Sequence, residues 1–267
     1  MRRALLGFTS GSAVGLLGGL IGLGGGEFRL PILTSLFDYA ARAAVPLNLV
    51  ISLITLMAAL AVRAHTLSLA AVLPHAVEAT ALGVGGIVGA RWSARLLTRL
   101  TDHRLEHLIA WLLAGIGVLL IVEAFLPGQP MALVSREPAT LIISGVVLGL
   151  VIGAVAALLG VAGGELLIPA LMLVYGADIR SAGTASLMIS IVTVLSGLLR
   201  YRRLAALPDI GSLRTVAVPM GLGSIAGAII GGLLVGLLPV AGLKVLLGAV
   251  LIAAASKPLW PTGKHWA

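Results

Sequence analysis

The chain contains long stretches without a single charged residue, and these stretches constrain its fold more than any other feature. They cover residues 4–26, 43–62, 138–164, 181–199 and 215–243. Because an α-helix rises about 1.5 Å per residue, roughly 20 apolar residues are enough to cross the hydrocarbon layer of a bilayer. Of the 267 residues, 59% are hydrophobic and only 10% are charged. Soluble domains of this length do not have such a composition. The sequence therefore predicts an all-α integral membrane protein.

A glycine-rich segment occurs twice inside these apolar runs. The first copy, residues 22–33, reads GLGGGEFRLPIL, and the second, residues 160–171, reads GVAGGELLIPAL. A constant offset of 138 pairs the Gly-Gly-Glu of 25–27 with that of 163–165. Irregular backbone at membrane depth is tolerated only where it is buried in protein or lines a cavity. An acidic residue at that depth is a candidate functional group.

The repeat extends over the whole chain, which we interpret as one transmembrane domain. Repeat one covers 1–127, repeat two covers 138–267, and the linker 128–137 begins in the turn-rich stretch after Pro127. Each repeat holds five apolar segments, at about 5–22, 27–37, 43–62, 68–90 and 105–126, and at about 140–160, 165–175, 182–199, 210–236 and 243–258. The second segment of each repeat is too short to cross the bilayer, which predicts the half-helix of a broken or re-entrant hairpin.

Five segments per repeat is an odd number, so the second repeat is expected to enter the membrane from the opposite face. Inverted repeats with discontinuous helices are typical of many secondary transporters. With the N-terminus inside, twelve basic residues fall inside and four fall outside, namely Arg63, Arg136, Arg180 and Lys244. This bias agrees with the positive-inside rule and predicts that both termini are cytoplasmic. One miscounted segment would make the repeats parallel instead.

Several function classes are excluded by what the sequence lacks. The net charge of +8 is spread over short loops and forms no continuous basic face, so we expect no nucleic-acid partner. The absence of cysteine excludes disulfides, thiolate metal sites and a cysteine-based substrate relay. No Walker motif, zincin motif or nucleophile elbow is present. We therefore expect no enzyme, no metal and no cofactor, and we interpret the N-terminal run as a retained helix, not a signal peptide.

The paired loops predict an anion-binding site made largely of backbone. Half-helices that begin at the loops would direct their N–H groups and positive dipole ends toward each other across a pseudo-two-fold axis. The residues expected to bind the substrate there are Gly24, Gly25, Gly26, Ala162, Gly163 and Gly164. The alternative, that glycines merely allow close helix packing, is favoured for scattered glycines such as Gly83, Gly85 and Gly89.

The acidic residues of the loops, Glu27 and Glu165, allow two interpretations. In the first turn of a helix, a carboxylate complements the helix dipole and caps it. A buried carboxylate can instead carry a proton that is coupled to transport. Because an ionised glutamate would repel a bound anion, coupling requires protonation while the anion is bound. The sequence leaves capping and proton coupling open.

Other polar residues extend the candidate site. Arg29 has Leu167 as its counterpart and is expected to bind an oxyanion or pair with an acid, or else to snorkel to the interface. Asn48 and Ser186 occupy equivalent positions and would line the site or form interhelical hydrogen bonds. A second pair of titratable residues is His75 and Glu78.

The pair His75 and Glu78 breaks the symmetry of the repeats. The two residues lie three apart and therefore share one helical face. Their counterparts are Leu213 and Val216. In a membrane helix such a pair indicates a proton relay or a cavity lining, and a position at the membrane interface is the alternative.

On these motifs the chain resembles the sulfite exporter TauE/SafE family of membrane permeases. The resemblance rests on the two glycine-rich loops followed by Pro-x-Leu, at 22–33 and 160–171, on the two-fold repeat and on the chain length. It implies a bacterial inner-membrane carrier for small sulfur-containing anions such as sulfite or sulfonates. Ala162 replaces Gly24 in the second copy, so that loop is expected to be less open. A related thiosulfate-uptake family uses cysteines along its path, and this chain has none.

Together these features predict a multi-pass secondary transporter that works by alternating access, with proton coupling as an option. Its expected partners are a small anionic substrate and the lipid bilayer, and a homodimer is one candidate for its oligomeric state. An anion channel and a non-transporting membrane scaffold are the alternatives. The sequence indicates neither the particular anion nor the direction of transport.

Overall fold

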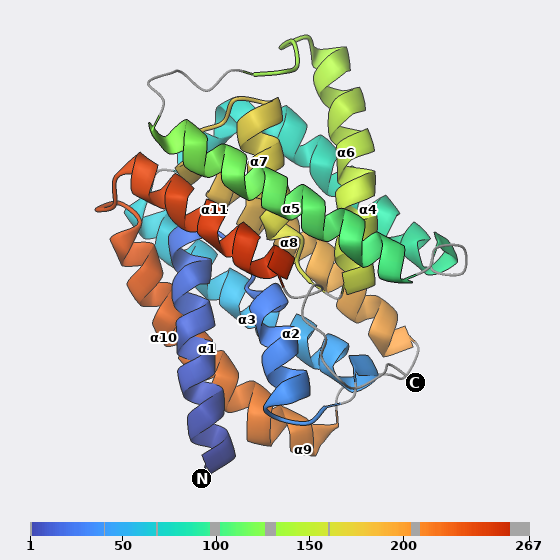
Figure 1. Ribbon diagram of the computed structural model, residues 1–267, viewed down its shortest axis with the longest axis vertical. Coiled ribbons are helices and arrows are strands. Elements are labelled where there is room, and N and C mark those ends of the chain that lie inside the picture. The colour runs from blue at the N-terminus through green and yellow to red at the C-terminus, as the bar shows by residue number, and fades with distance from the viewer. Residues whose placement is uncertain are drawn as a thin grey trace. The chain divides into compact units, whose positions relative to one another are not determined.

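The computed structural model describes residues 2–39, 41–67, 69–96, 102–125, 132–159, 161–203 and 209–256. Figure 1 shows that these residues form helices joined by turns, and no β-strand occurs among them. The predicted all-α class is confirmed. Each of the ten predicted apolar segments corresponds to a helix or to a run of consecutive helices.

The order of helices is repeated along the chain. The first set is α1 (Arg2–Ile21), α2 (Gly26–Ser35), α3 (Ala41–Thr66), the 3₁₀-helix η1 (Leu69–His75), α4 (Ala76–Leu96) and α5 (Asp102–Phe125). The second set is α6 (Pro138–Leu159), α7 (Gly164–Pro169), the π-helix η2 (Ala170–Val174), α8 (Ile179–Arg203), α9 (Ile210–Ser212), the π-helix η3 (Leu213–Ala217), α10 (Val218–Leu234) and α11 (Val240–Ser256). In both sets a long first helix is followed by a short helical segment and then by long helices.

Six helices in the described part of the chain are long and apolar enough to cross a membrane. They are Arg2–Ile21, Ala43–Thr66, Val72–Trp92, Pro138–Ala157, Ile179–Arg203 and Leu213–Leu234. The short helix α2 has 10 residues, which is only about 15 Å at the rise of an α-helix. The number of long apolar helices makes this a multi-pass membrane protein.

The contacts divide the chain into two units. The larger unit comprises Met1–Ala94 and Pro130–Leu238, and it contains both glycine loops. The smaller unit comprises Arg95–Gln129 and Pro239–Ala267, with the helices α5 and α11.

Glycines hold the long helices of the larger unit together. A Cβ atom on Gly15 of α1 would overlap the backbone of Ser224 on α10, and one on Gly153 of α6 would overlap the backbone of Gly86 on α4. Adding 138 to Gly15 and subtracting 138 from Ser224 converts the first pair into the second. The same exchange relates Gly11–Met220 to Gly149–Leu82, Gly223–Phe8 to Gly85–Val146, and Gly227–Ser12 to Gly89–Leu150. These glycine contacts therefore occur in matched pairs, in which equivalent helices of the two repeats exchange places.

The packing interpretation of the scattered glycines is confirmed for Gly85 and Gly89, whose missing side chains allow α4 to approach α6 closely. It is wrong for Gly83, because no atom of the described residues lies within 4 Å of the position that its Cβ would occupy.

The directions of equivalent helices follow from these contacts. Leu49, near the start of α3, packs beside Gly197, near the end of α8. Arg63, near the end of α3, bonds to Arg180 and Thr184, near the start of α8. Helices α3 and α8 occupy equivalent places in the two repeats and run antiparallel.

Within the smaller unit, α5 and α11 also pack through glycine. A Cβ on Gly117 would lie 2.7 Å from the carbonyl oxygen of Gly248, and one on Gly248 would lie 2.6 Å from that of Gly117. Gly117 additionally faces Ile252 while Ile121 faces Gly248, so this pair is antiparallel too.

The glycine contacts predict a selective loss of stability on substitution. Gly15→Ala forces α1 away from α10, and overpacking of this kind costs about 1–3 kcal/mol. Gly83→Ala, on an open helix surface, is expected to be neutral or slightly stabilising. The thermal midpoint of the purified protein measures both effects, and equal midpoints for the two variants would contradict the packing described above.

Candidate functional site

The two glycine loops meet inside the larger unit. A Cβ on Gly24 would lie 2.6 Å from the Cβ of Ala162. These two residues are each other's counterparts at the offset of 138, so exchanging the repeats leaves this contact unchanged. Helices α2 and α7 begin on either side of this contact, at Gly26 and Gly164.

The residues that flank the loop contact obey the same exchange. A Cβ on Gly26 would lie 3.4 Å from the Cα of Val161, and one on Gly164 would lie 3.4 Å from the Cα of Leu23. The start of each short helix therefore packs on the loop of the other repeat. The sequence prediction that the two loops face each other agrees with this geometry.

The backbone of the loops requires glycine. Gly25 and Gly163 precede α2 and α7 with φ of 68° and 79°, in the left-handed region. Gly22 has φ of 96°. Side chains are strained at such angles, and a Cβ on Gly25 would also overlap the side chain of Val14. Neither helix start carries a side-chain cap on the residue before it.

Arg29 is fully buried beside the first loop. One terminal nitrogen donates to the hydroxyl of Ser52 at 2.8 Å. The other donates to the carbonyl of Gly24 at 2.8 Å and to the hydroxyl of Thr55 at 3.0 Å. The snorkelling alternative is therefore wrong, because the guanidinium lies in the protein interior. The guanidinium places a positive charge next to Gly24, one of the two residues that form the loop contact.

Helices α3 and α8 supply equivalent polar side chains to the two loops. Asn48 of α3 donates to the carbonyl of Gly26 at 3.2 Å, and its counterpart Ser186 of α8 lies against Gly164. Both side chains are fully buried. The hydroxyl of Ser186 has no hydrogen-bond partner in the described part of the chain. One turn further along α8, Ser190 donates to the carbonyl of Ala162 at 3.1 Å.

The structure describes the side chain of Glu165 but only the backbone of Glu27. Glu165 is buried in the first turn of α7, with 3% of its surface exposed. The backbone of Glu27 lies in the first turn of α2, but its side chain lies outside the described residues. Capping and proton coupling both stay predictions for these residues.

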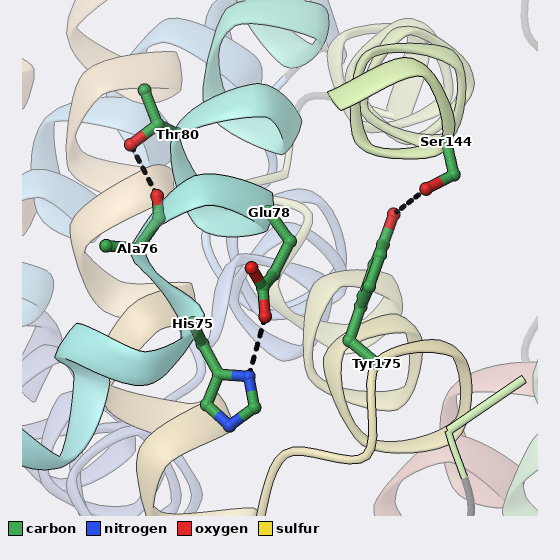
Figure 2. Close-up of polar contacts among 6 residues, drawn as sticks. All are labelled: His75, Ala76, Glu78, Thr80, Ser144 and Tyr175. Carbon is green, nitrogen blue, oxygen red and sulfur yellow. Dashed lines mark hydrogen bonds and ion pairs between the residues drawn. The ribbon is translucent and has the colours of Figure 1, made fainter. Parts of the chain in front are cut away.

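His75 and Glu78 form a separate cluster at the junction of η1 and α4. The Nδ1 atom of His75 lies 2.7 Å from Oε1 of Glu78, and both side chains are buried (Figure 2). Beside them, the hydroxyl of Tyr175 donates to that of Ser144 at 3.1 Å. The sequence predicts the pairing of His75 with Glu78 from their spacing. It contains no pattern that indicates Tyr175 or Ser144 as neighbours of this pair.

Arg63 is the main residue that sequence analysis misplaced. The topology count treats it as an outside loop charge, whereas it is fully buried in α3. It donates to the carbonyls of Gly19 at 3.1 Å and Leu20 at 2.8 Å, in the last turn of α1, and to the carbonyl of Arg180. The last carbonyls of a helix have no partner within the helix, and the guanidinium satisfies two of them. Removing Arg63 from the count leaves twelve inside charges against three.

Comparison with known proteins assigns the chain to a family. The family model described as "Sulfite exporter TauE/SafE" matches residues 6–258. The chain belongs to the sulfite exporter TauE/SafE family. This TauE/SafE protein is therefore a transmembrane permease. Searches of curated proteins and of solved structures returned no match.

The contacts of Arg63 predict that its guanidinium is needed for the stability of this TauE/SafE protein. Arg63→Gln leaves carbonyls of α1 without donors, and each such buried group costs about 1–3 kcal/mol. Arg63→Lys is expected to rescue little, because one ammonium cannot reproduce the guanidinium fork. The readouts are thermal midpoint and yield of monodisperse protein, with exposed Arg202→Gln as control. An Arg63→Gln variant as stable as the control would disprove the assigned role.

Proposed function

We propose that this TauE/SafE protein is a secondary transporter that moves a small sulfur-containing anion, such as sulfite or an organosulfonate, by alternating access. The family's own description names sulfite. The observation that carries the proposal is the contact of the two glycine loops at the equivalent residues Gly24 and Ala162, with the buried guanidinium of Arg29 directly behind it. An anion at this place would meet positive charge and two helix starts.

The proposal includes an inverted arrangement of the two repeats in the bacterial inner membrane, with both termini cytoplasmic. It is supported by the antiparallel run of α3 beside α8 and of α5 beside α11, since these helices occupy equivalent places. Parallel repeats would give equivalent helices the same direction. On this account α2 and α7–η2 are the half-helices of two re-entrant hairpins that converge from opposite faces.

Substrate binding would require the two loops to separate. In the described arrangement the two terminal nitrogens of Arg29 donate to Ser52, Thr55 and the carbonyl of Gly24. A sulfur oxyanion presents several acceptor oxygens, and charge-assisted hydrogen bonds from a guanidinium are strong. We propose that the anion takes over part of these donors when the loops move apart. The hydroxyl of Ser186 and the amide of Asn48 lie at the two helix starts and would complete the site.

The two loop acids enter the proposal as groups that either preorganise the helix starts or carry a coupled proton. Burial of Glu165 supports both, because desolvation favours the neutral acid while the start of α7 favours the carboxylate.

The loop account predicts a loss of transport when side chains are added at the helix starts. A Cβ on Gly26 would come within 2.9 Å of Asn48 Nδ2, and one on Gly164 within 3.2 Å of Ser186 Oγ. Gly26→Val and Gly164→Val are therefore expected to abolish anion flux into proteoliposomes. Gly83→Val is the control, since that position is open. Undiminished flux in both loop variants, at normal yield, would sink the proposal.

A carrier also predicts a particular form of the flux. Uptake should saturate with anion concentration and should be accelerated by anion on the opposite side of the membrane. A channel predicts flux that saturates weakly and shows no such acceleration, and a scaffold predicts no flux. The panel is sulfite, sulfate, thiosulfate, sulfoacetate and simple carboxylates, measured with and without a pH gradient. Preference for carboxylates over every sulfur anion would contradict the substrate class.

A further inference from the structure

The cluster of His75, Glu78, Ser144 and Tyr175, here called the polar cluster, has a chemistry of its own. Glu78 is faced by two titratable groups, His75 from η1 and Tyr175 from the end of η2, and α6 brings in the hydroxyl of Ser144 (Figure 2). The turn of α4 that carries Glu78 packs directly on α6, because a Cβ on Gly145 would lie 3.3 Å from the Glu78 carbonyl. The η1–α4 junction, the end of η2 and α6 therefore meet around Glu78.

The carboxyl group of Glu78 is incompletely satisfied. Its Oε1 lies 2.7 Å from His75 Nδ1, whereas its Oε2 is buried without a hydrogen-bond partner in the described part of the chain. An ionised carboxylate only accepts hydrogen bonds, so His75 must then carry the proton on Nδ1. With a neutral imidazole the pair holds one negative charge, and uptake of one proton by His75 or Glu78 removes it. Burying an unsatisfied carboxylate oxygen is costly, and Oε2 is therefore an acceptor atom left open for a proton or for a donor group.

The residues equivalent to the polar cluster under exchange of the repeats are apolar. At the offset of 138, the counterparts of His75, Glu78 and Tyr175 are Leu213, Val216 and Phe37. Val216 and Phe37 are buried in one hydrophobic cluster, against which Leu213 packs. The same place in the fold is therefore titratable in one half and apolar in the other. Pseudo-symmetry alone does not demand this difference, so the cluster is an addition to the shared architecture.

The polar cluster is also joined to the second glycine loop. Helices α7 and η2 run without a break from Gly164 at the loop to Val174. Tyr175 follows immediately, and its backbone N–H closes the end of η2 on the carbonyl of Met172. The Tyr175 hydroxyl then attaches this end to Ser144 of α6. Any change in the electrostatics beside Tyr175 therefore acts on the far end of the segment whose near end forms the loop.

From this geometry we propose that the polar cluster is a proton-binding site of the transporter, and that its protonation state controls the attachment of α7–η2 to α6. The inference rests on the proposed transport function and identifies the coupled ion and the moving element. Loss of the negative charge at Glu78 changes the field at the Tyr175 hydroxyl and loosens or tightens the bond to Ser144. The α7–η2 segment then transmits the change to the loop.

Transport in proteoliposomes tests the coupling. Glu78→Gln keeps the shape of the side chain and removes its titration, so anion exchange at uniform pH should persist while stimulation by a pH gradient is lost. Tyr175→Phe copies the counterpart Phe37 and removes only the attachment to Ser144; it should reduce the stimulation too. Glu137→Gln, at an exposed position before α6, is the control and should behave as the unmodified protein. Full stimulation by the gradient in Glu78→Gln would overturn the inference.

A second measurement needs no substrate and so separates this inference from the proposed function. Hydrogen–deuterium exchange of residues 164–176, corrected for the chemical effect of pH, should change between acidic and neutral pH in the unmodified protein. The change should vanish in Glu78→Gln, and in Tyr175→Phe exchange should be faster at every pH. Exchange that is independent of pH in the unmodified protein would overturn the inference. If no anion in the panel is transported, the proposed function fails, while this measurement still decides the role of the polar cluster.

Discussion

The whole arrangement depends on satisfying unwound backbone inside a membrane protein. Two loops interrupt apolar helices, and lipid offers their N–H and C=O groups no partners. The protein meets this constraint by packing the loops on each other at Gly24 and Ala162 and by supplying donors from neighbouring helices. Arg29 and Ser190 donate to the carbonyls of those two residues. Because the satisfied groups lie at the contact of the two loops, the place that stabilises the fold is also the place where we propose that the anion is held.

Two buried arginines, Arg29 and Arg63, bind different sets of acceptors in the larger unit. Arg29 faces the loop contact through hydroxyl and carbonyl acceptors, which suits a group that can exchange partners with a ligand. Arg63 joins the last turn of α1 to the start of α8, so it links one repeat to the other through backbone acceptors. Neither arginine has a basic counterpart at the offset of 138, where the chain has Leu167 and Tyr201. The symmetry of the backbone thus carries an asymmetric set of charges, and the polar cluster around Glu78 extends that asymmetry.

Sequence analysis reached most of the fold because membrane helices are encoded locally. Uncharged runs mark the long helices, and the repeated Gly-Gly-Glu marks the loops and their offset. Contacts between distant segments were out of reach. The run 43–62 stops one residue before Arg63, so a charge at the end of an apolar segment was interpreted as a loop charge, and only the position of the last turn of α1 shows otherwise. Likewise Tyr175 and Ser144 have no local signal that places them beside Glu78, although their departure from the counterparts Phe37 and Leu6 was visible in the repeat.

The central claim is that the two converging loops hold the transported anion. The most direct measurement is an experimental structure of the protein in lipid, solved with and without bound sulfite under oxygen-free conditions. The account predicts an additional feature between the starts of α2 and α7, within hydrogen-bonding distance of Arg29, and a wider separation of Gly24 from Ala162 than in the anion-free state. Sulfite bound elsewhere in the protein, with the two loops still in contact, would contradict it.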